Sequence, residues 1–282
     1  MNNQPAYFVF KLRQNIALEG DLQIAQMELD AFLPGTLKIV ERIETLLRDF
    51  PALGQLRGFG NLNKHTRQNG NQAFLAQGTL EMLPNLIRRV SFVERIYCIT
   101  ENTEDAQVLV SKLEKDAGPV IVAQVNGGQL IVQAVPYYAL FELADVVARH
   151  THGTFETKQR LDDLVCALLD KTEDHDAVKM TEVALSARSV IAPLSHDVHY
   201  YKAKFFPRLA RSMLNVCMQK LGERPHRVVD NFAGSGTTLL EASTLGVPSV
   251  GFDIDPLSVL IAKAKLEAVQ FDSDFWLVKS PA

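Results

Sequence analysis

The feature that most constrains this chain is a glycine-rich turn between a short apolar run and an amphipathic helix. Residues 227–230 (RVVD) precede the sequence NFAGSGTT at 231–238, and apolar residues then recur at helical spacing up to Leu245. This pattern predicts a strand, a tight turn and a helix. Gly234 and Gly236 let the backbone turn sharply and approach a ligand closely. The following helix points its first N–H groups at that ligand.

A second strand is predicted at 249–252, and it ends in an acid. Asp253 lies 23 residues beyond Asp230, and a helix is predicted after it at 257–266. A carboxylate at the tip of the second strand can accept hydrogen bonds from both hydroxyls of an adenosine ribose. Strand, turn, helix, strand and acid in this order predict a nucleotide-like ligand site.

The residues around the turn distinguish between possible ligands. The dinucleotide fingerprint has a third glycine where this chain has Leu239, and the phosphate-binding P-loop has a lysine that does not follow Gly236 here. S-adenosylmethionine has no pyrophosphate and needs neither feature. We therefore predict S-adenosylmethionine as the cofactor, with its adenosine at Asp253 and its methionine over the glycine turn.

Three segments carry a resemblance to DNA amino-methyltransferases, which modify N4 of cytosine or N6 of adenine. Residues 230–238 (DNFAGSGTT) look like their DPFxGSGTT motif, with Asn231 in place of the usual proline, and residues 251–256 (GFDIDP) match their second cofactor motif. Residues 199–207 (HYYKAKFFP) resemble the segment that lines the methionine end of the cofactor. By residue type alone, an exposed basic loop or a surface for stacking bases stays open for this segment. The resemblance implies that the cofactor is bound by Lys204, Phe206, Asp230, Phe232, Ala233, Gly234, Ser235, Gly236, Thr237, Asp253 and Ile254.

The N-terminal half has a weaker resemblance to a second family. Residues 7–33 and 73–98 have the rhythm of the THUMP-type RNA-binding region of tRNA guanine-N2 methyltransferases, and residues 207–211 (PRLAR) occur in the linker of that group. This resemblance implies RNA as an alternative partner.

We expect an α/β fold in three parts. An N-terminal α/β or α+β domain, in which nucleic-acid binding is possible, spans 1–150; a helical linker spans 151–195; and a partial methyltransferase domain spans 196–282. The first part is predicted to contain strands at 6–12, 73–75, 93–100, 120–125 and 129–135, helices at 21–32, 39–50, 81–89, 105–115 and 138–149, and a loop at 57–72. Residues 156–185 contain eight acidic and four basic residues, which is typical of a solvated helix.

Neither family's catalytic motif is present. Both place Asp, Asn or Ser before Pro-Pro-aromatic at the end of the fourth strand, whereas this sequence contains no Pro-Pro pair. We therefore assign no catalytic residue and expect a Rossmann-like class I methyltransferase fold that is incomplete at its C-terminus. A fragment of a longer product is favoured over a split enzyme completed by a second chain or a degenerate relative. The chain by itself is not expected to methylate a substrate.

Composition narrows the class of protein. The net charge of −4 excludes a globally basic nucleic-acid binder, so binding requires a local patch. The three cysteines match no metal-ligand spacing and are expected to be reduced and buried in a cytoplasmic protein without a membrane span. The leading hypothesis is an S-adenosylmethionine-dependent methyltransferase acting on an exocyclic nitrogen of a nucleic-acid base, with DNA favoured. The alternatives are a tRNA guanine-N2 methyltransferase and a non-catalytic binding or specificity subunit.

Overall fold

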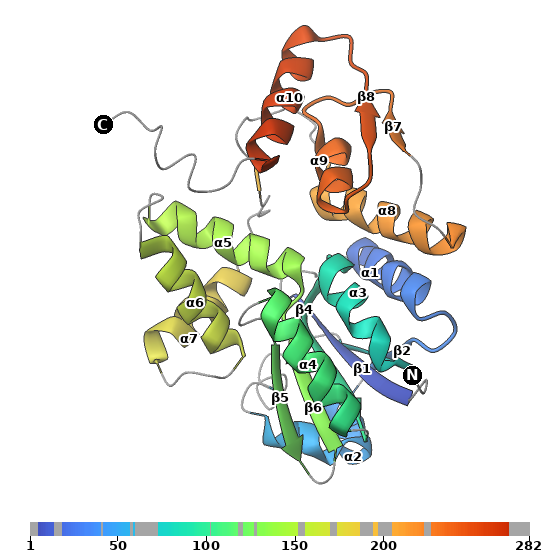
Figure 1. Ribbon diagram of the computed structural model, residues 1–282, viewed down its shortest axis with the longest axis vertical. Helices are drawn as coiled ribbons and strands as arrows, with labels where there is room; N and C mark the ends of the chain where they lie inside the picture. Colours follow the sequence, from blue (N-terminus) through green and yellow to red (C-terminus); the bar gives the residue numbers. More distant parts are fainter. Residues whose placement is uncertain are drawn as a thin grey trace. The chain divides into compact units, whose positions relative to one another are not determined.

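In a computed structural model, the chain forms two compact units, Met1–Val190 and Ile191–Ala282. The model is shown in Figure 1. The structure describes residues 5–13, 19–40, 42–56, 59, 73–101, 103–117, 121–126, 129–151, 156–169, 174–186, 194–196, 205–222 and 227–270.

The first unit is organised around a six-stranded sheet. Its spatial order is β2-β3-β1-β4-β6-β5, and every neighbouring pair is antiparallel. The strands are β1 (Pro5–Leu12), β2 (Lys38–Val40), β3 (Ala73–Thr79), β4 (Val93–Thr100), β5 (Ile121–Asn126) and β6 (Gln129–Ala134). The helices are α1 (Glu19–Phe32), α2 (Ile43–Asp49), α3 (Leu83–Arg89), α4 (Thr103–Ala117), α5 (Tyr137–Thr151), α6 (Glu156–Leu168) and α7 (His175–Ser186). The expected mixture of helices and strands is confirmed, and antiparallel pairing favours the α+β arrangement for this unit.

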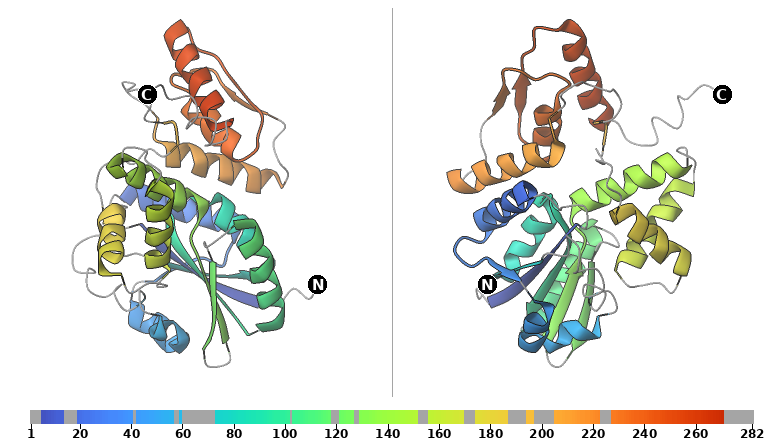
Figure 2. Two further views of the ribbon diagram at one scale, coloured as in Figure 1. Left: turned by 60° about the vertical axis from the view of Figure 1, so that its left-hand side comes forward. Right: turned by 180° about the vertical axis from the view of Figure 1, so that it is seen from behind.

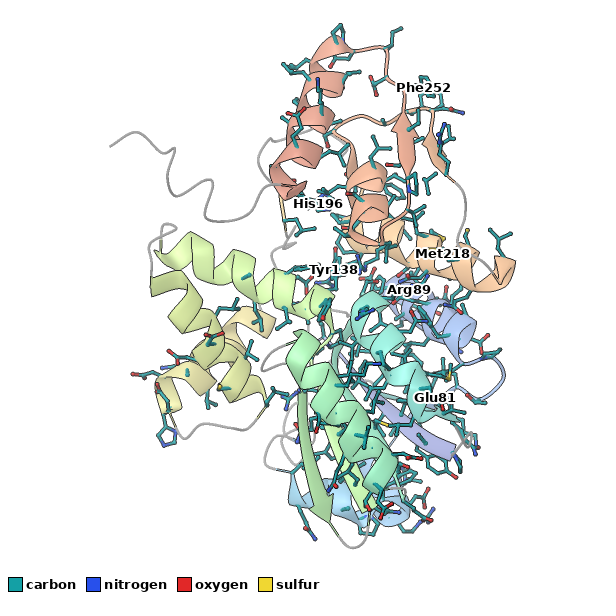
Figure 3. The ribbon with its side chains drawn as sticks, viewed as in Figure 1. Glu81, Arg89, Tyr138, His196, Met218 and Phe252 are labelled. Carbon is teal, nitrogen blue, oxygen red and sulfur yellow. The ribbon has the colours of Figure 1, made fainter. Side chains whose placement is uncertain are left out.

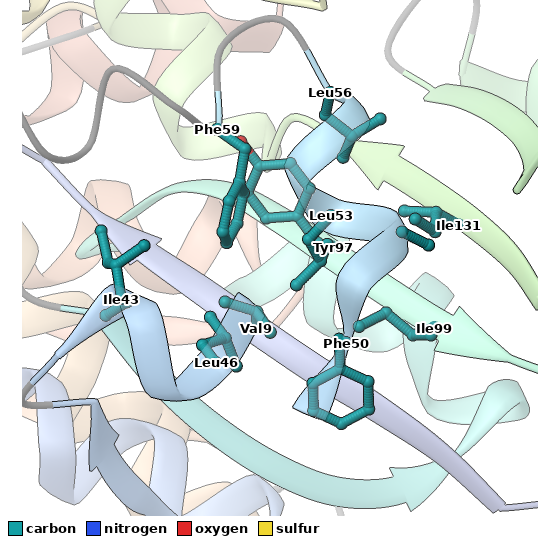
Figure 4. Close-up of a cluster of buried hydrophobic side chains, with 12 residues drawn as sticks. Val9, Ile43, Leu46, Phe50, Leu53, Leu56, Phe59, Tyr97, Ile99 and Ile131 are labelled. Carbon is teal, nitrogen blue, oxygen red and sulfur yellow. The ribbon is translucent and has the colours of Figure 1, made fainter. Parts of the chain in front are cut away.

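Both faces of this sheet are covered, because every residue of β4 is buried. On one face, α2 and the 3-10 helix η1 (Pro51–Gln55) place Leu46 and Leu53 against side chains from the central strands, including Val9 and Tyr97 (Figure 4). On the other face, a Cβ added to Gly78 would lie 2.7 Å from Leu33 Cδ2 and 3.1 Å from the Phe8 ring. Glycine at position 78 therefore allows the chain after α1 to approach the sheet closely.

Three elements of this unit differ from the sequence-based expectation. The predicted helix at 39–50 is wrong at its start, because Ile39 lies in β2 and the helix begins at Ile43. Pairing with β3 explains the difference, since Ile39 opposes Phe74 in the sheet. The strand predicted at 73–75 continues to Thr79, and the helix predicted at 81–89 starts with a 3-10 turn at Leu80–Met82. Most of the loop predicted at 57–72 lies outside the described residues.

The acidic stretch at 156–185 forms two helices, α6 and α7, instead of one. Val165 of α6 and the following Leu169 pack with Ala139 and Leu143 of α5 in a small hydrophobic cluster. Thr181 of α7 donates a hydrogen bond to the Leu164 carbonyl oxygen at 3.3 Å. The two helices therefore form a helical layer with α5 within the first unit, up to Val190.

A buried charge cluster lies where β1 and β4 fall out of register. Lys11 opposes Arg95 and Leu12 opposes Val93, so Glu94 is the extra residue of a β-bulge. Lys11 Nζ lies 2.8 Å from Glu94 Oε1, and Arg95 Nη2 lies 3.6 Å from the same oxygen. Burial by itself raises the pKa of the Glu94 carboxyl, but the charges of Lys11 and Arg95 outweigh it, so this pKa lies below its usual value.

The cysteines differ in accessibility, which corrects the expectation of three buried thiols. Cys98 is buried in β4, Cys166 is half-buried and Cys217 is exposed. Burial raises the pKa of the Cys98 thiol, so its reactive thiolate is scarce at neutral pH. We expect iodoacetamide to modify Cys217 in the native protein and Cys98 only after unfolding, which peptide mass spectrometry checks. Rapid native modification of Cys98 would contradict this assignment.

The described residues of the second unit form a parallel strand pair and three helices. β7 (Val228–Asp230) pairs with β8 (Ser249–Gly251), and α9 (Thr237–Thr244) connects them. α10 (Pro256–Gln270) follows β8 and lies on the same side of the strand pair as α9 (Figure 2). α8 (Pro207–Leu221) places Met218 against Ala242, Leu245 and Val247 in a core at the far end of α9. The strands and helices predicted from the glycine-rich turn are thus present in the predicted order.

Candidate functional site at the carboxyl ends of β7 and β8

The segments that leave β7 and β8 are held together by backbone hydrogen bonds. Phe252 N–H donates to the Asp230 carbonyl oxygen, and Ala233 N–H donates to the Phe252 carbonyl oxygen, each at 2.9 Å. Phe252 lies just beyond the end of β8 (Figure 3). The parallel pairing therefore brings the glycine turn and the acidic end of β8 to the same edge, as expected for a βαβ unit.

The two glycines of the turn adopt backbone angles that other residues avoid. Gly234 has φ +50° and Gly236 has φ +78°. Gly236 is also the residue that precedes α9, and a Cβ there would lie 2.8 Å from Ala262 Cβ and 3.1 Å from Ala262 Cα. The absence of a side chain at Gly236 therefore serves both the left-handed backbone and the close approach of α10.

Asp253 connects the end of β8 to the turn. Its Oδ2 accepts a hydrogen bond from Gly234 N–H at 2.7 Å, and its Oδ1 accepts one from Asp255 N–H at 3.0 Å. An ionised carboxylate offers about four acceptor sites, so these two bonds leave capacity for donors from a ligand. The sequence-predicted pair of Asp253 and the glycine turn is thus in direct contact.

Two apolar side chains in the segments that leave β7 and β8 face solvent. Phe232 in the turn is 91% exposed, and Ile254 next to Asp253 is 100% exposed. Covering an apolar side chain of this size contributes about 1.5–3 kcal/mol. Because they are exposed, these side chains are available to cover an apolar part of a ligand.

The other predicted site residues differ in how a ligand could reach them. Asp230 is half-buried and its Oδ1 accepts from Phe232 N–H at 3.1 Å. Ser235 and Thr237 have buried side chains, so a ligand would meet their backbone groups. Phe206 is half-buried at the start of α8, where the Arg208 guanidinium carbon lies 5.7 Å from its ring centroid. Lys204 and the rest of 197–204 lie outside the described residues.

Asp255 has a structural role that the motif did not reveal. Its Oδ1 accepts from Leu257 N–H at 3.0 Å and its Oδ2 accepts from the Ser258 hydroxyl at 2.9 Å. The hydrogen bond from Ser258, followed by that from Leu257, lowers the pKa of Asp255. Asp255 therefore caps α10, and the signal for this was the Asp-Pro pair at 255–256, where proline begins a helix after its cap.

The sequence did not predict a buried polar cluster around Glu241 of α9. Glu241 lies in the apolar run that follows the glycines and is completely buried. Its Oε1 is 2.8 Å from His196 Nε2, and its Oε2 is 3.2 Å from Arg211 Nη1. The one available sequence signal was a charged residue between Leu240 and Ala242 on the helix face that packs inward.

No protein-family model matches the chain. Three curated proteins are similar to it over part of its length. The Type II methyltransferase M.MjaII of Methanocaldococcus jannaschii is 40% identical over 72 residues, and the Type II methyltransferase M.MvaI of Kocuria varians is 36% identical over 77 residues. The tRNA (guanine(10)-N2)-dimethyltransferase of Methanothermobacter thermautotrophicus is 36% identical over 83 residues. The predicted resemblance to DNA methyltransferases and the weaker one to tRNA guanine-N2 methyltransferases are both confirmed.

The similarity covers a minor part of every sequence involved. It spans 26%, 27% and 29% of this chain, and 13%, 17% and 24% of the three relatives in the same order. The matched stretches thus represent less than a quarter of the length of each relative. Similarity to methyltransferases is therefore shown for a segment of the chain and not for its whole length.

Two further observations concern the described part of the chain. No helix within it is long and apolar enough to cross a membrane. Within the same residues, no group of three or more His, Cys, Asp or Glu side chains is arranged to hold a metal ion.

Proposed function

We propose that residues 230–255 bind S-adenosylmethionine and that the chain is part of a methyltransferase acting on an exocyclic amino group of a nucleic-acid base. The observation that carries this proposal is the 2.7 Å hydrogen bond from Gly234 N–H to the Asp253 carboxylate. It puts an acceptor for ribose hydroxyls beside the turn at the start of α9. Similarity to three methyltransferases over about a quarter of the chain supports the same reaction class.

Each part of this cofactor has a suitable counterpart in the site. Asp253 would accept hydrogen bonds from the ribose hydroxyls, and Ile254 and Phe232 would cover the adenine. The backbone N–H groups at the start of α9 suit the carboxylate of the methionine part. The predicted set also includes Phe206, Asp230, Ala233, Ser235, Gly236 and Thr237, with Lys204 outside the described residues. When bound, S-adenosylmethionine supplies an activated methyl group on its sulfonium.

The chain's own residues account for cofactor binding but not for the target base. A methyltransferase of this type must hold the amino nitrogen in line with the methyl group, and that is mainly a matter of positioning. The Pro-Pro-aromatic motif that does this in the resembling families is absent from the sequence. We propose that another polypeptide segment, in the same gene product or a second chain, supplies it, and that these 282 residues alone do not transfer methyl groups.

DNA is the favoured substrate because residues 230–238 and 251–256 carry the more specific resemblance. A tRNA guanine is the second candidate, supported by the tRNA methyltransferase among the similar proteins. Transfer of tritiated methyl groups by the full gene product to DNA or to tRNA separates them. A non-catalytic specificity subunit is the third candidate, and it predicts cofactor binding without transfer to either nucleic acid.

Cofactor binding is tested by calorimetric titration of the full chain with S-adenosylmethionine. We expect Asp253→Ala to weaken binding about 10- to 100-fold, because a hydrogen bond to a charged group is worth about 1.5–3 kcal/mol. Asp255→Asn is the matched control, since it removes one neighbouring negative charge and keeps a side chain that can cap α10. Its affinity should match that of the unchanged chain. Equal affinity of Asp253→Ala and the unchanged chain would refute the ribose assignment.

A further inference from the structure

Glu241 connects elements of the second unit that are distant in sequence. It lies on α9, about one helical turn after the helix begins at Thr237, and its side chain is 0% exposed. One carboxylate oxygen meets His196 Nε2 at 2.8 Å and the other meets Arg211 Nη1 at 3.2 Å. His196 lies near α9 and α10 in Figure 3, whereas Arg211 belongs to α8. One buried carboxylate is therefore shared by two donors from different segments.

Further hydrogen bonds tie this group to its surroundings. Arg211 Nη1 also donates to the Thr244 hydroxyl at 2.8 Å, and that hydroxyl donates to the Glu241 carbonyl oxygen at 2.8 Å. The His196 carbonyl oxygen accepts from Lys265 Nζ at 3.1 Å, and the Ser195 hydroxyl donates to the Lys265 carbonyl oxygen at 3.0 Å. Residues 194–196, α8, α9 and α10 are thus joined through buried polar groups.

The negative charge of Glu241 determines which nitrogen of the His196 imidazole donates the hydrogen bond between them. An ionised carboxylate only accepts hydrogen bonds, so His196 Nε2 must carry the proton that it shares with Glu241. Arg211 places one positive charge 3.2 Å from this carboxylate, and the ammonium of Lys265 binds the His196 carbonyl oxygen. A charged group of this kind is costly to bury unless it is well bonded, and here each carboxylate oxygen of Glu241 has a partner, so removing either partner should disturb the arrangement around α9.

We propose that Glu241 is a positioning residue that clamps His196 and α8 to the helix beginning at the cofactor turn. The proposal rests on the proposed function. Glu241 lies on α9, whose first N–H groups are expected to bind the methionine carboxylate, and it holds His196 and Arg211 of α8 against that helix. None of the clamp side chains comes from β8 or from 252–254, where the adenosine is expected to bind. The clamp therefore acts on the methionine half of the site.

Because the site has an adenosine half and a methionine half, the two can be tested separately. General destabilisation of the unit would weaken binding of both ligands, whereas loss of the clamp should weaken only S-adenosylmethionine. Calorimetry on the full chain would measure the affinities for S-adenosylmethionine and for adenosine in each variant. We expect His196→Ala to weaken S-adenosylmethionine about tenfold while adenosine changes less than about twofold. His196→Gln should restore most of the loss, because its amide N–H can donate from a position close to that of Nε2. The carbonyl oxygen that binds Lys265 is kept in both variants.

Two more variants keep the test decisive. Val247→Ala loosens the core beside α9 without touching the clamp, so its two affinities should change by the same factor or not at all. If His196→Ala does not fold, Glu241→Gln replaces it, because the amide keeps the size of the side chain and removes its charge; the same selective loss is expected. An unchanged ratio of the two affinities in the clamp variants would overturn the clamp and leave the proposed function standing. Binding of neither ligand by the unchanged chain would overturn both.

Discussion

Gly236→Ala is expected to lower the free energy of unfolding of the second unit by about 3 kcal/mol. The left-handed backbone, with φ +78°, costs a residue with a Cβ about 1–2 kcal/mol. The new Cβ would also lie 2.8 Å from Ala262 Cβ and 3.1 Å from its Cα, and such overpacking costs about 1–3 kcal/mol. Hydrogen exchange of peptides from α9 and α10 measures the change.

A matched glycine separates the two causes. Gly222 ends α8 with φ +67°, but a Cβ there meets no atom within 4 Å. Gly222→Ala should therefore cost only about 1 kcal/mol, which is the backbone contribution alone. Gly236→Ala should also cost less in an Ala262→Gly background, because the closest contact is gone. Equal losses for Gly236→Ala and Gly222→Ala would show that the approach of α10 is unimportant.

Glu94→Ala is expected to destabilise the first unit by about 3–5 kcal/mol, because it leaves the buried ammonium of Lys11 without its carboxylate. Hydrogen exchange of peptides from β1 and β4 reports this loss. Replacing both partners, as in Lys11→Met with Glu94→Leu, should recover part of it, since apolar side chains of similar volume avoid burying that pair of charges while Arg95 still loses its contact with Glu94. Asp49→Ala serves as the exposed control. Asp49 pairs with Arg48 at 3.3 Å on the surface, and its loss should cost less than about 0.5 kcal/mol.

The same carboxylate predicts a pH dependence. The pKa of Glu94 in the folded chain is lowered below the value of about 4.3 that an unfolded glutamate has. The unfolded chain therefore binds a proton first as the pH falls, and Glu94 contributes its full stability above that value and loses it in more acidic solution. Unfolding in denaturant at pH 6 and pH 3.5 should show a smaller acid-induced loss in the double variant than in the unchanged chain. An identical loss in both would rule out Glu94 as a source.

Elements that depend on short sequence patterns were predicted from the order of residues. The two strands β5 and β6 were predicted on either side of the Asn-Gly-Gly sequence at 126–128, which is a strong signal for a strand–turn–strand pattern. The strand at β4 was predicted residue for residue from its run of β-branched and aromatic residues. Ile39 was misassigned because its helical spacing to Ile43 is a local pattern, whereas its pairing with Phe74 depends on a strand 35 residues away.

The glycine turn shows most clearly where prediction from the sequence ends. Residue types and spacing alone determined the strand, turn, helix and strand, together with Asp253 as the acid beside the turn, because each depends on neighbours within about 25 residues. Only the tertiary structure decided that Asp253 contacts Gly234 directly, that Gly236 makes room for Ala262, and that Glu241 holds His196 and Arg211. These contacts depend on how α8, α9 and α10 pack, and packing joins residues whose separation along the chain carries no periodic signal.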